Sequence, residues 1–225
     1  MQTAIQQNLH SVLAQLPDGV QLVAISKYHP ADCIQEAYEA GQRVFGESHE
    51  QELSKKHEIL PRDIEWHFIG HLQTNKVKYI APYISMIEAA DSVKLLKEIN
   101  KQALKNERVI DVLLELHLAQ EETKFGFSPE QCRQFLDEGE WRNMKGIRIC
   151  GLMMMASNTD EQQQIEEEFA LAYDLFKEFR QTYFADCDYF CKRSWGMSHD
   201  YLIATAHGSN MVRVGTRIFG ERAYL

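Results

Sequence analysis

The chain has 225 residues, of which 44% are hydrophobic and 25% are charged. This composition is ordinary for a globular protein and excludes intrinsic disorder, because there is enough apolar surface to offset the entropy lost on folding. The 24 Lys and Arg against 33 Asp and Glu give a net charge of −9. That balance argues against a non-specific nucleic-acid binder, but it leaves room for a local basic pocket that takes a small anion.

Neither a membrane segment nor a disulfide scaffold is expected. No run of about 18 apolar residues occurs, and residues 1–7 lack the basic flank and apolar run of a signal peptide. The five cysteines are odd in number and scattered, which favours a reducing, cytoplasmic location. Cys187 and Cys191 are spaced like half of a metal site, but no second pair stands nearby, so buried or bystander thiols are the favoured interpretation.

The first predicted element is a helix over residues 3–16, whose apolar side chains recur at helical spacing. The turn sequence Pro17-Asp18-Gly19 ends it. Eight apolar, β-prone runs follow, and most are continuous rather than alternating, as is typical of a parallel sheet covered on both faces. They lie at residues 22–26, 43–46, 66–70, 86–90, 110–118, 147–156, 189–197 and 211–216.

Helical patterns separate these strands. One begins at Pro30 and ends at Gly41, and Asp91 is expected to cap another. The sequence Ser128-Pro129-Glu130-Gln131 is a capping box with proline at the first helical position, and Gly139 ends that helix. A long helix with an acidic face is expected around residues 165–176.

Strand and helix therefore alternate until eight strands are complete. This pattern predicts a single α/β domain over residues 1–225, a (β/α)8 barrel of the TIM type, with residues 1–17 forming an extra N-terminal helix packed on the barrel. An open, doubly wound sheet is the alternative, because periodicity does not show closure.

In such a barrel the site lies at the C-terminal mouth, where the strands end. Lys27 ends the first apolar run, and its apolar surroundings are expected to lower the pKa of the amine, as Schiff-base chemistry requires. A solvated loop lysine is the alternative. Lys124 is expected on the same rim but solvated, and Lys55 and Lys56 are expected to be exposed because they stand in a polar stretch.

A phosphate-binding group is expected at the ends of the last two strands. Gly215 and Thr216, between a strand and a short helix, offer backbone N–H groups and a hydroxyl. Ser198 is expected to cap a helix over residues 201–207, and a helix start also suits an anion. Arg213 stands two residues before Gly215 and so points to the same side of the strand, toward the mouth; a salt-bridged packing arginine is the alternative.

Two further segments are interpreted as structural. Residues 66–76 are dense in polar groups, but His67 taken alone is interpreted as a satisfied core histidine rather than a catalytic one. Residues 151–156 are apolar enough to fill the barrel and are interpreted as doing so.

Seven segments together carry a resemblance to a known family. They are Ala24-Ile25-Ser26-Lys27, Phe45-Gly46-Glu47, residues 66–76, Glu121-Glu122-Thr123-Lys124, Gly151-Leu152-Met153, Gly196-Met197-Ser198, and residues 208–220 with Val212-Arg213-Val214-Gly215-Thr216. In this order they closely resemble the YggS/PROSC family of pyridoxal phosphate homeostasis proteins, which is related to the barrel domain of alanine racemase. The resemblance runs from about residue 20 to about residue 222.

The resemblance implies a barrel that carries pyridoxal 5′-phosphate (PLP) as an aldimine of Lys27. It implies that Arg213 faces the pyridine nitrogen and that Ser198, Gly215 and Thr216 hold the phosphate. Two positions depart from the family pattern. Ser48 stands where members usually have Asn, and its shorter side chain leaves any cofactor contact at this position open. Trp195 stands where Met is common, and its bulk is expected to reshape the wall near the residues that the resemblance assigns to the phosphate.

These residues favour a cofactor carrier over an enzyme. An arginine cannot accept the pyridinium proton, so the electron sink of the cofactor is weakened. An alanine racemase also takes a second base from a second domain and a dimer partner, and we expect no such domain after Leu225. The expected function is intracellular PLP homeostasis without dedicated turnover; a PLP-dependent amino-acid racemase is the alternative. The expected partners are PLP and PLP-dependent apoenzymes, not nucleic acid or a membrane, and a monomer is expected.

Overall fold

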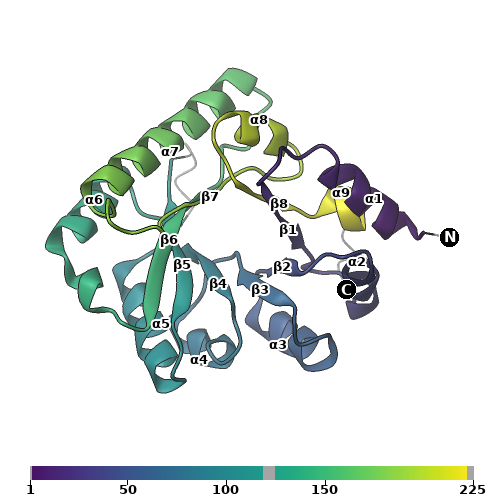
Figure 1. Ribbon diagram of the computed structural model, residues 1–225, viewed down its shortest axis with the longest axis horizontal. Coiled ribbons are helices and arrows are strands. Elements are labelled where there is room, and N and C mark those ends of the chain that lie inside the picture. Colours follow the sequence, from purple (N-terminus) through teal and green to yellow (C-terminus); the bar gives the residue numbers. More distant parts are fainter. Residues whose placement is uncertain (1, 119–124, 222–225) are drawn as a thin grey trace.

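The structure is a computed structural model that describes residues 2–118 and 125–221. Eight parallel strands close into a barrel in chain order, with β1 paired to both β2 and β8 (Figure 1). They are β1 (Gln21–Ile25), β2 (Val44–Glu47), β3 (Glu65–Phe68), β4 (Met86–Ala90), β5 (Ile110–Leu116), β6 (Ile147–Met154), β7 (Lys192–Ser194) and β8 (Met211–Val214). The predicted (β/α)8 barrel is therefore confirmed, and the alternative of an open sheet is wrong.

Helices surround the barrel as an outer layer (Figure 1). They are α1 (Ala4–Leu13), α2 (Ala31–Glu39), α3 (Glu50–Ile59), α4 (Val77–Ile80), α5 (Val93–Lys105), α6 (Pro129–Glu138), α7 (Gln162–Thr182), α8 (Tyr201–Ala206) and α9 (Thr216–Phe219), with 3-10 helices at Thr74–Lys76 and Glu140–Asn143. Among the helices in the described ranges, none is both long enough and apolar enough to span a bilayer.

The apolar side chains form one core under the helices and a second core inside the barrel. Successive side chains of a strand point to opposite faces, and β1 contributes to both cores. Leu22 and Ala24 pack under the helices, whereas Val23 and Ile25 pack inside the barrel. Burial on both faces explains why the strands appear in the sequence as continuous apolar runs rather than alternating ones.

The N-terminal helix α1 packs against α2 and α9, beside the last strand (Figure 1). Thr3 and Gln6 form a capping box at its start, and Leu9 and Val12 are its buried residues. The side chain of Asn8 donates a hydrogen bond to the carbonyl of Ile218 at 3.2 Å. The predicted helix over residues 3–16 is confirmed in position, although its regular part is shorter.

The strand β7 has only three residues, although the apolar run that predicts it spans nine. The chain leaves the sheet after Ser194, and Gly196 adopts the left-handed region at φ +91°, where a Cβ atom would lie 2.5 Å from the Cβ of Ala204. Burial alone therefore overestimates the length of this strand, because Trp195 and Gly196 are buried but lie beyond its end, although the carbonyl of Gly196 still accepts a hydrogen bond from Arg213 N at 3.0 Å.

Two predicted helix caps are wrong. The cap of α5 is Ser92, whose hydroxyl accepts a hydrogen bond from Leu95 N at 3.3 Å, while Asp91 lies 2.5 Å from the imidazole of His71. The helix α8 begins at Tyr201, so Ser198 stands too early to cap it. The capping box that begins at Ser128 is confirmed.

Candidate functional site

The residues predicted to form the site come from three neighbouring strands at the C-terminal mouth. Lys27 is half-buried in the turn directly after β1, and Gly215 follows β8. The two strands are paired, with Val23 opposite Arg213, which brings the segments after them together. A Cβ atom on Gly215 would lie 3.0 Å from the carbonyl oxygen of Ile25, so the backbone approaches closely there.

The predicted phosphate-binding residues meet at one point of this mouth. The backbone N–H of Gly215 donates a hydrogen bond to the hydroxyl of Ser198 at 3.2 Å, and Thr216 is the exposed first residue of α9. Arg217 donates from Nε to the carbonyl of Ser198 at 2.6 Å. Two hydroxyls, backbone N–H groups and a nearby guanidinium are donors of the kind that hold a phosphate.

Arg213 is buried in the barrel and held on several sides. Its Nη1 donates to the carbonyl and the hydroxyl of Ser194 at 2.7 and 2.6 Å, and its Nη2 donates to the carbonyl of Met154 at 2.7 Å. The carboxylate of Glu88 lies 3.8 Å away. Burial lowers the pKa of the guanidinium, whereas Glu88, Asp200 and Glu115 act to raise it.

Glu88 joins this arginine to a buried histidine. Its carboxylate accepts a hydrogen bond from the Ser194 hydroxyl at 2.5 Å and lies 2.7 Å from Nδ1 of His67. Complete burial alone would raise the pKa of Glu88, but the hydrogen bond to His67 and the charges of His67 and Arg213 hold it below its usual value. The interpretation of His67 as a satisfied core histidine is confirmed, and its partner is a carboxylate in the barrel interior.

Glu115 is a further buried acid near the arginine, with only 3% of its surface exposed. In the part of the chain that the structure describes, its Oε2 has no hydrogen-bond partner. Burial raises its pKa to about 7, Asp91 adds to the rise, and Arg213 opposes it. The barrel interior near the mouth thus combines one guanidinium with one paired carboxylate and one largely unpaired carboxyl group.

The sequence pattern does not single out Glu88, Glu115 or Ser194, because each stands within a run that predicts only an apolar strand. A signal was present, since Glu88 and Glu115 are acidic residues flanked on both sides by apolar residues within β4 and β5. An acid in the middle of such a strand is buried, and buried charges are rare unless they are paired.

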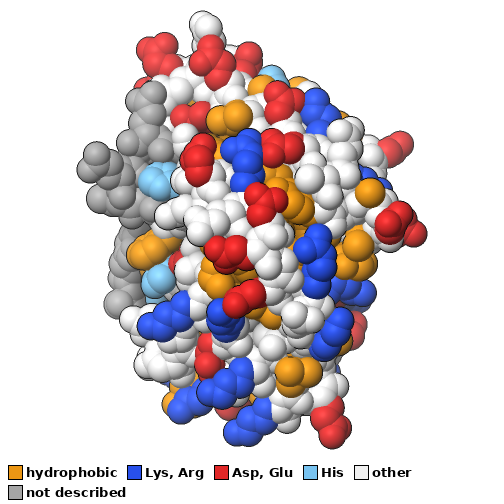
Figure 2. Space-filling view, turned by 90° about the vertical axis from the view of Figure 1, so that its left-hand side faces the viewer, with side chains coloured by type: hydrophobic (Ala, Val, Ile, Leu, Met, Phe, Trp, Pro, Cys, Tyr) orange, Lys and Arg blue, Asp and Glu red, His pale blue; other side chains and the backbone are white. Residues whose placement is uncertain are grey.

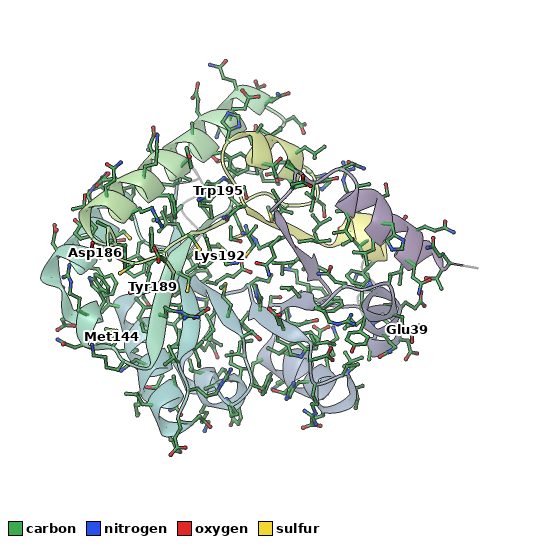
Figure 3. All side chains as sticks on the ribbon, in the orientation of Figure 1. Glu39, Met144, Asp186, Tyr189, Lys192 and Trp195 are labelled. Atoms are coloured by element: carbon green, nitrogen blue, oxygen red, sulfur yellow. The ribbon has the colours of Figure 1, made fainter. Side chains whose placement is uncertain are left out.

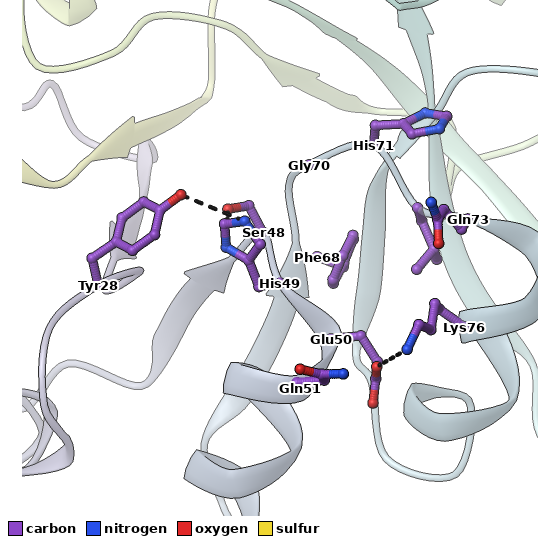
Figure 4. Close-up of a pocket in the computed structure, with 11 residues that line it drawn as sticks. Tyr28, Ser48, His49, Glu50, Gln51, Phe68, Gly70, His71, Gln73 and Lys76 are labelled. Atoms are coloured by element: carbon purple, nitrogen blue, oxygen red, sulfur yellow. Dashed lines mark hydrogen bonds and ion pairs between the residues drawn. The ribbon is translucent and has the colours of Figure 1, made fainter. Parts of the chain in front are cut away.

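Next to the turn that carries Lys27 lies a cavity of about 550 Å³ (Figure 4). Ser48, one of the two departures from the family pattern, lines it, and its hydroxyl lies 3.2 Å from Nδ1 of His49. Tyr28 points toward His49 at the wall of the cavity, with 3.5 Å between the phenol oxygen and Nε2. Ser48 therefore lies in the wall of this cavity, where its side chain is shorter than that of an asparagine.

Trp195, the second departure, is fully buried beside β7 (Figure 3). Its ring belongs to the core under the helices rather than to the core inside the barrel. Its carbonyl accepts a hydrogen bond from the Ser209 hydroxyl at 2.8 Å. Its bulk therefore packs behind the strand rather than inside the barrel.

The remaining predictions concern three lysines and two cysteines. Lys124 lies outside the described residues. Lys55 is exposed as expected, but the expectation for Lys56 is wrong, because its side chain is buried. Cys187 and Cys191 are half-buried free thiols, and no three His, Cys, Asp or Glu side chains in the described ranges are placed to hold a metal ion.

Comparison with known proteins gives the class of this barrel. Residues 2–223 match the family model of the alanine racemase N-terminal domain. Alanine racemase from Streptomyces lavendulae shares the fold, with a TM-score of 0.76 at 16% identity over 97% of this chain and 59% of that chain.

Closer similarity links the chain to a narrower group. It is 38% identical to the pyridoxal phosphate homeostasis protein of Aquifex aeolicus over 91% of this chain and 88% of that protein. It is also 38% identical to that of Schizosaccharomyces pombe over 95% of this chain and 90% of that protein. PipY of Synechococcus elongatus PCC7942, solved with PLP bound, has a TM-score of 0.87 at 34% identity and covers 96% of this chain and 100% of its own. The chain belongs to the family of pyridoxal phosphate homeostasis proteins.

Proposed function

We propose that this protein binds PLP through Lys27 and takes part in PLP homeostasis in the cell. One observation carries the proposal: the closed barrel brings the turn with Lys27 beside Ser198 and Gly215. An amine that can bind an aldehyde and a group of donors that can bind a phosphate therefore stand at the same mouth. The solved relative with PLP bound supports the choice of cofactor.

The residues present fit this cofactor by their chemistry. Ser198, Gly215 and Thr216 supply two hydroxyls and backbone N–H groups without a carboxylate among them, which suits a phosphate dianion. A Cβ atom on Gly215 would lie 3.0 Å from the carbonyl oxygen of Ile25, which favours glycine there, and the Gly215 N–H donates to the Ser198 hydroxyl, so these two groups lie side by side. Lys27 supplies the amine.

Arg213 is proposed to face the ring nitrogen, and this assignment favours carriage over catalysis. PLP supplies an electron sink when its ring nitrogen is protonated, and a carboxylate partner maintains that proton. Arg213 cannot accept a proton from the ring, and Glu88 and Ser194 hold its guanidinium in place. We therefore propose a role without dedicated turnover.

The proposal extends to partners and place. The recipients or donors of the cofactor are proposed to be PLP-dependent apoenzymes in the cytoplasm, and the working form is proposed to be a monomer that binds neither nucleic acid nor a membrane. The face shown in Figure 2 supports the proposal that the protein does not bind nucleic acid, because acidic and basic side chains are intermixed on it rather than gathered into a basic surface.

The experiment that tests the function is titration of the purified protein with PLP, followed by its visible absorption and by borohydride reduction. We expect a new absorption band, a stable adduct after reduction, and no interconversion of alanine enantiomers in a chiral assay. Absence of both band and adduct would contradict the binding role. Sustained racemisation would contradict the proposal that the protein lacks turnover.

A further inference from the structure

An ionic cluster, buried except for one half-buried glutamate, lies directly under the turn that carries Lys27. It consists of Lys56 and Glu52 from α3 and Glu47 from the end of β2. The Lys56 ammonium donates to Oε1 of Glu47 at 2.7 Å and to Oε1 of Glu52 at 2.6 Å. None of these three residues is among those proposed to hold the cofactor.

The cluster holds the residue on each side of Lys27. On one side, Ser26 accepts a hydrogen bond from Lys56 Nζ on its carbonyl at 2.9 Å and donates from its hydroxyl to Glu47 Oε1 at 2.6 Å. On the other side, the backbone N–H of Tyr28 donates to Glu52 Oε1 at 2.7 Å. The backbone between these two anchors contains only Lys27.

The anchor at Tyr28 also fixes an unfavourable backbone conformation. Tyr28 has φ +66°, in the left-handed region that non-glycine residues seldom adopt. Such a conformation persists only where its surroundings determine it. The hydrogen bond from Tyr28 N to Glu52 provides that constraint, and the conformation sets the direction in which the chain leaves Lys27.

Burying the charges of this cluster costs free energy. Lys56 is 6% exposed and Glu47 is 0% exposed, and Glu47 Oε2 has no hydrogen-bond partner in the part of the chain that the structure describes. Burial raises the pKa of Glu47 to about 7, and the Lys56 ammonium opposes that rise. Replacing a buried ion pair with apolar side chains is often neutral for stability. The cluster is therefore poorly explained by stability alone.

We infer that Lys56 is a positioning residue that acts together with Glu47 and Glu52. The three side chains fix the backbone on both sides of Lys27, so that the Lys27 amine meets an aldehyde bound at the mouth. This inference rests on the proposed function. Binding an aldehyde to Lys27 forms a C=N bond and releases the carbonyl oxygen as water, which takes both protons of the neutral amine. Misplacement of that amine slows and weakens this step while leaving the phosphate contacts intact.

The test compares two ligands on the variant Lys56→Met, which keeps the length of the side chain and removes its charge. PLP can bind Lys27 covalently, whereas pyridoxine 5′-phosphate has the same phosphate and ring but no aldehyde. We expect the affinity for PLP to fall by about 10- to 100-fold, because small misplacements of a reacting group have effects of that size. The affinity for pyridoxine 5′-phosphate stays within about two-fold. The matched control is Lys55→Met, one residue away on the same helix and exposed, which leaves both affinities unchanged.

Two further measurements separate positioning from general damage. In a Lys27→Ala background, Lys56→Met should not lower the remaining PLP affinity further, because no amine is left to position. In the protein without cofactor, hydrogen exchange at the Tyr28 amide should be faster in Lys56→Met than in Lys55→Met. If Lys56→Met does not fold, Glu52→Ala takes its place, since it removes the acceptor of Tyr28 N.

Each other outcome contradicts the inference. Equal losses for both ligands would mean that the cluster supports the whole mouth, and unchanged PLP affinity would mean that it does not act on Lys27. If the unmodified protein does not bind PLP covalently, the proposed function itself fails. That result is distinct from failure of the positioning role.

Discussion

The Nη1 atom of Arg213 lies 2.6 Å from the hydroxyl oxygen of Ser194, inside the barrel. The same hydroxyl donates to Glu88 at 2.5 Å, so one serine connects the guanidinium with a buried carboxylate. The structure thus shows the salt-bridged packing arginine that the sequence offers as one alternative. The other interpretation, in which Arg213 reaches the mouth and faces the cofactor ring, stays a prediction.

Removal of Glu88 should therefore destabilise the protein strongly. The variant Glu88→Ala removes the carboxylate that forms an ion pair with the buried Arg213, and it leaves the Ser194 hydroxyl without its acceptor. We expect a loss of about 3–5 kcal/mol in the free energy of unfolding, measured by urea denaturation. The exposed strand residue Glu65 provides a control, and Glu65→Ala should change the value by less than about 0.5 kcal/mol. A similar small change for both variants would contradict the role of Glu88.

The raised pKa of Glu115 predicts how stability depends on pH. Its carboxyl group has a pKa of about 7 in the folded protein against 4.5 for an ordinary glutamate, because of burial. Between these values the folded state binds more protons than the unfolded state, so stability falls as the pH rises from about 4.5 to about 7. The contribution of the protonated Glu115 to the free energy of unfolding is present in full below pH 4.5 and amounts to roughly 3 kcal/mol.

The variant Glu115→Gln tests this dependence. It cannot bind the proton, so the fall in the free energy of unfolding between pH 4.5 and pH 7 should become shallower. Some fall should remain, because burial also raises the pKa of Glu47 to about 7. Identical pH profiles for the variant and the unmodified protein, measured by urea denaturation at several pH values, would show that Glu115 does not titrate in this range.

The proposed phosphate site predicts a loss of binding affinity that depends on the ligand. Replacing Ser198 and Thr216 together with Ala removes both hydroxyls at the mouth, at about 1.5–3 kcal/mol for each bond to a charged group. PLP affinity should fall accordingly in a titration, whereas affinity for pyridoxal, which lacks the phosphate, should not change. Because Ser198 does not cap α8, the fold should be little affected. Parallel losses for PLP and pyridoxal would place the phosphate elsewhere.

The barrel is predictable from the sequence because burial on both faces of each strand leaves a recognisable pattern. Eight apolar runs separated by helical patterns are enough to predict the barrel. The capping box at Ser128 also predicts the start of one helix correctly. The ends of the elements are less predictable. At β7, burial continues through Trp195 after pairing has ended, and at α5 two candidate caps, Asp91 and Ser92, stand side by side.

The buried charges are the part that sequence patterns do not give. Lys56 stands in a polar stretch that is typical of an exposed helix face, and only the packing of α3 against the end of β1 places its ammonium beside Ser26. Likewise, Glu88 and Arg213 are 125 positions apart in the chain and meet only because the barrel closes. Contacts of this kind follow from the three-dimensional closure rather than from local spacing.

Peptide mapping after borohydride reduction of the PLP-treated protein tests most directly whether Lys27 binds the cofactor. We expect the reduced adduct on Lys27, and we expect Lys27→Ala to abolish both the adduct and the visible absorption band. Lys27→Ala should retain part of the affinity for PLP, because the proposed phosphate contacts remain. An adduct on another lysine, such as Lys124, with Lys27 unmodified, would contradict the assignment of Lys27.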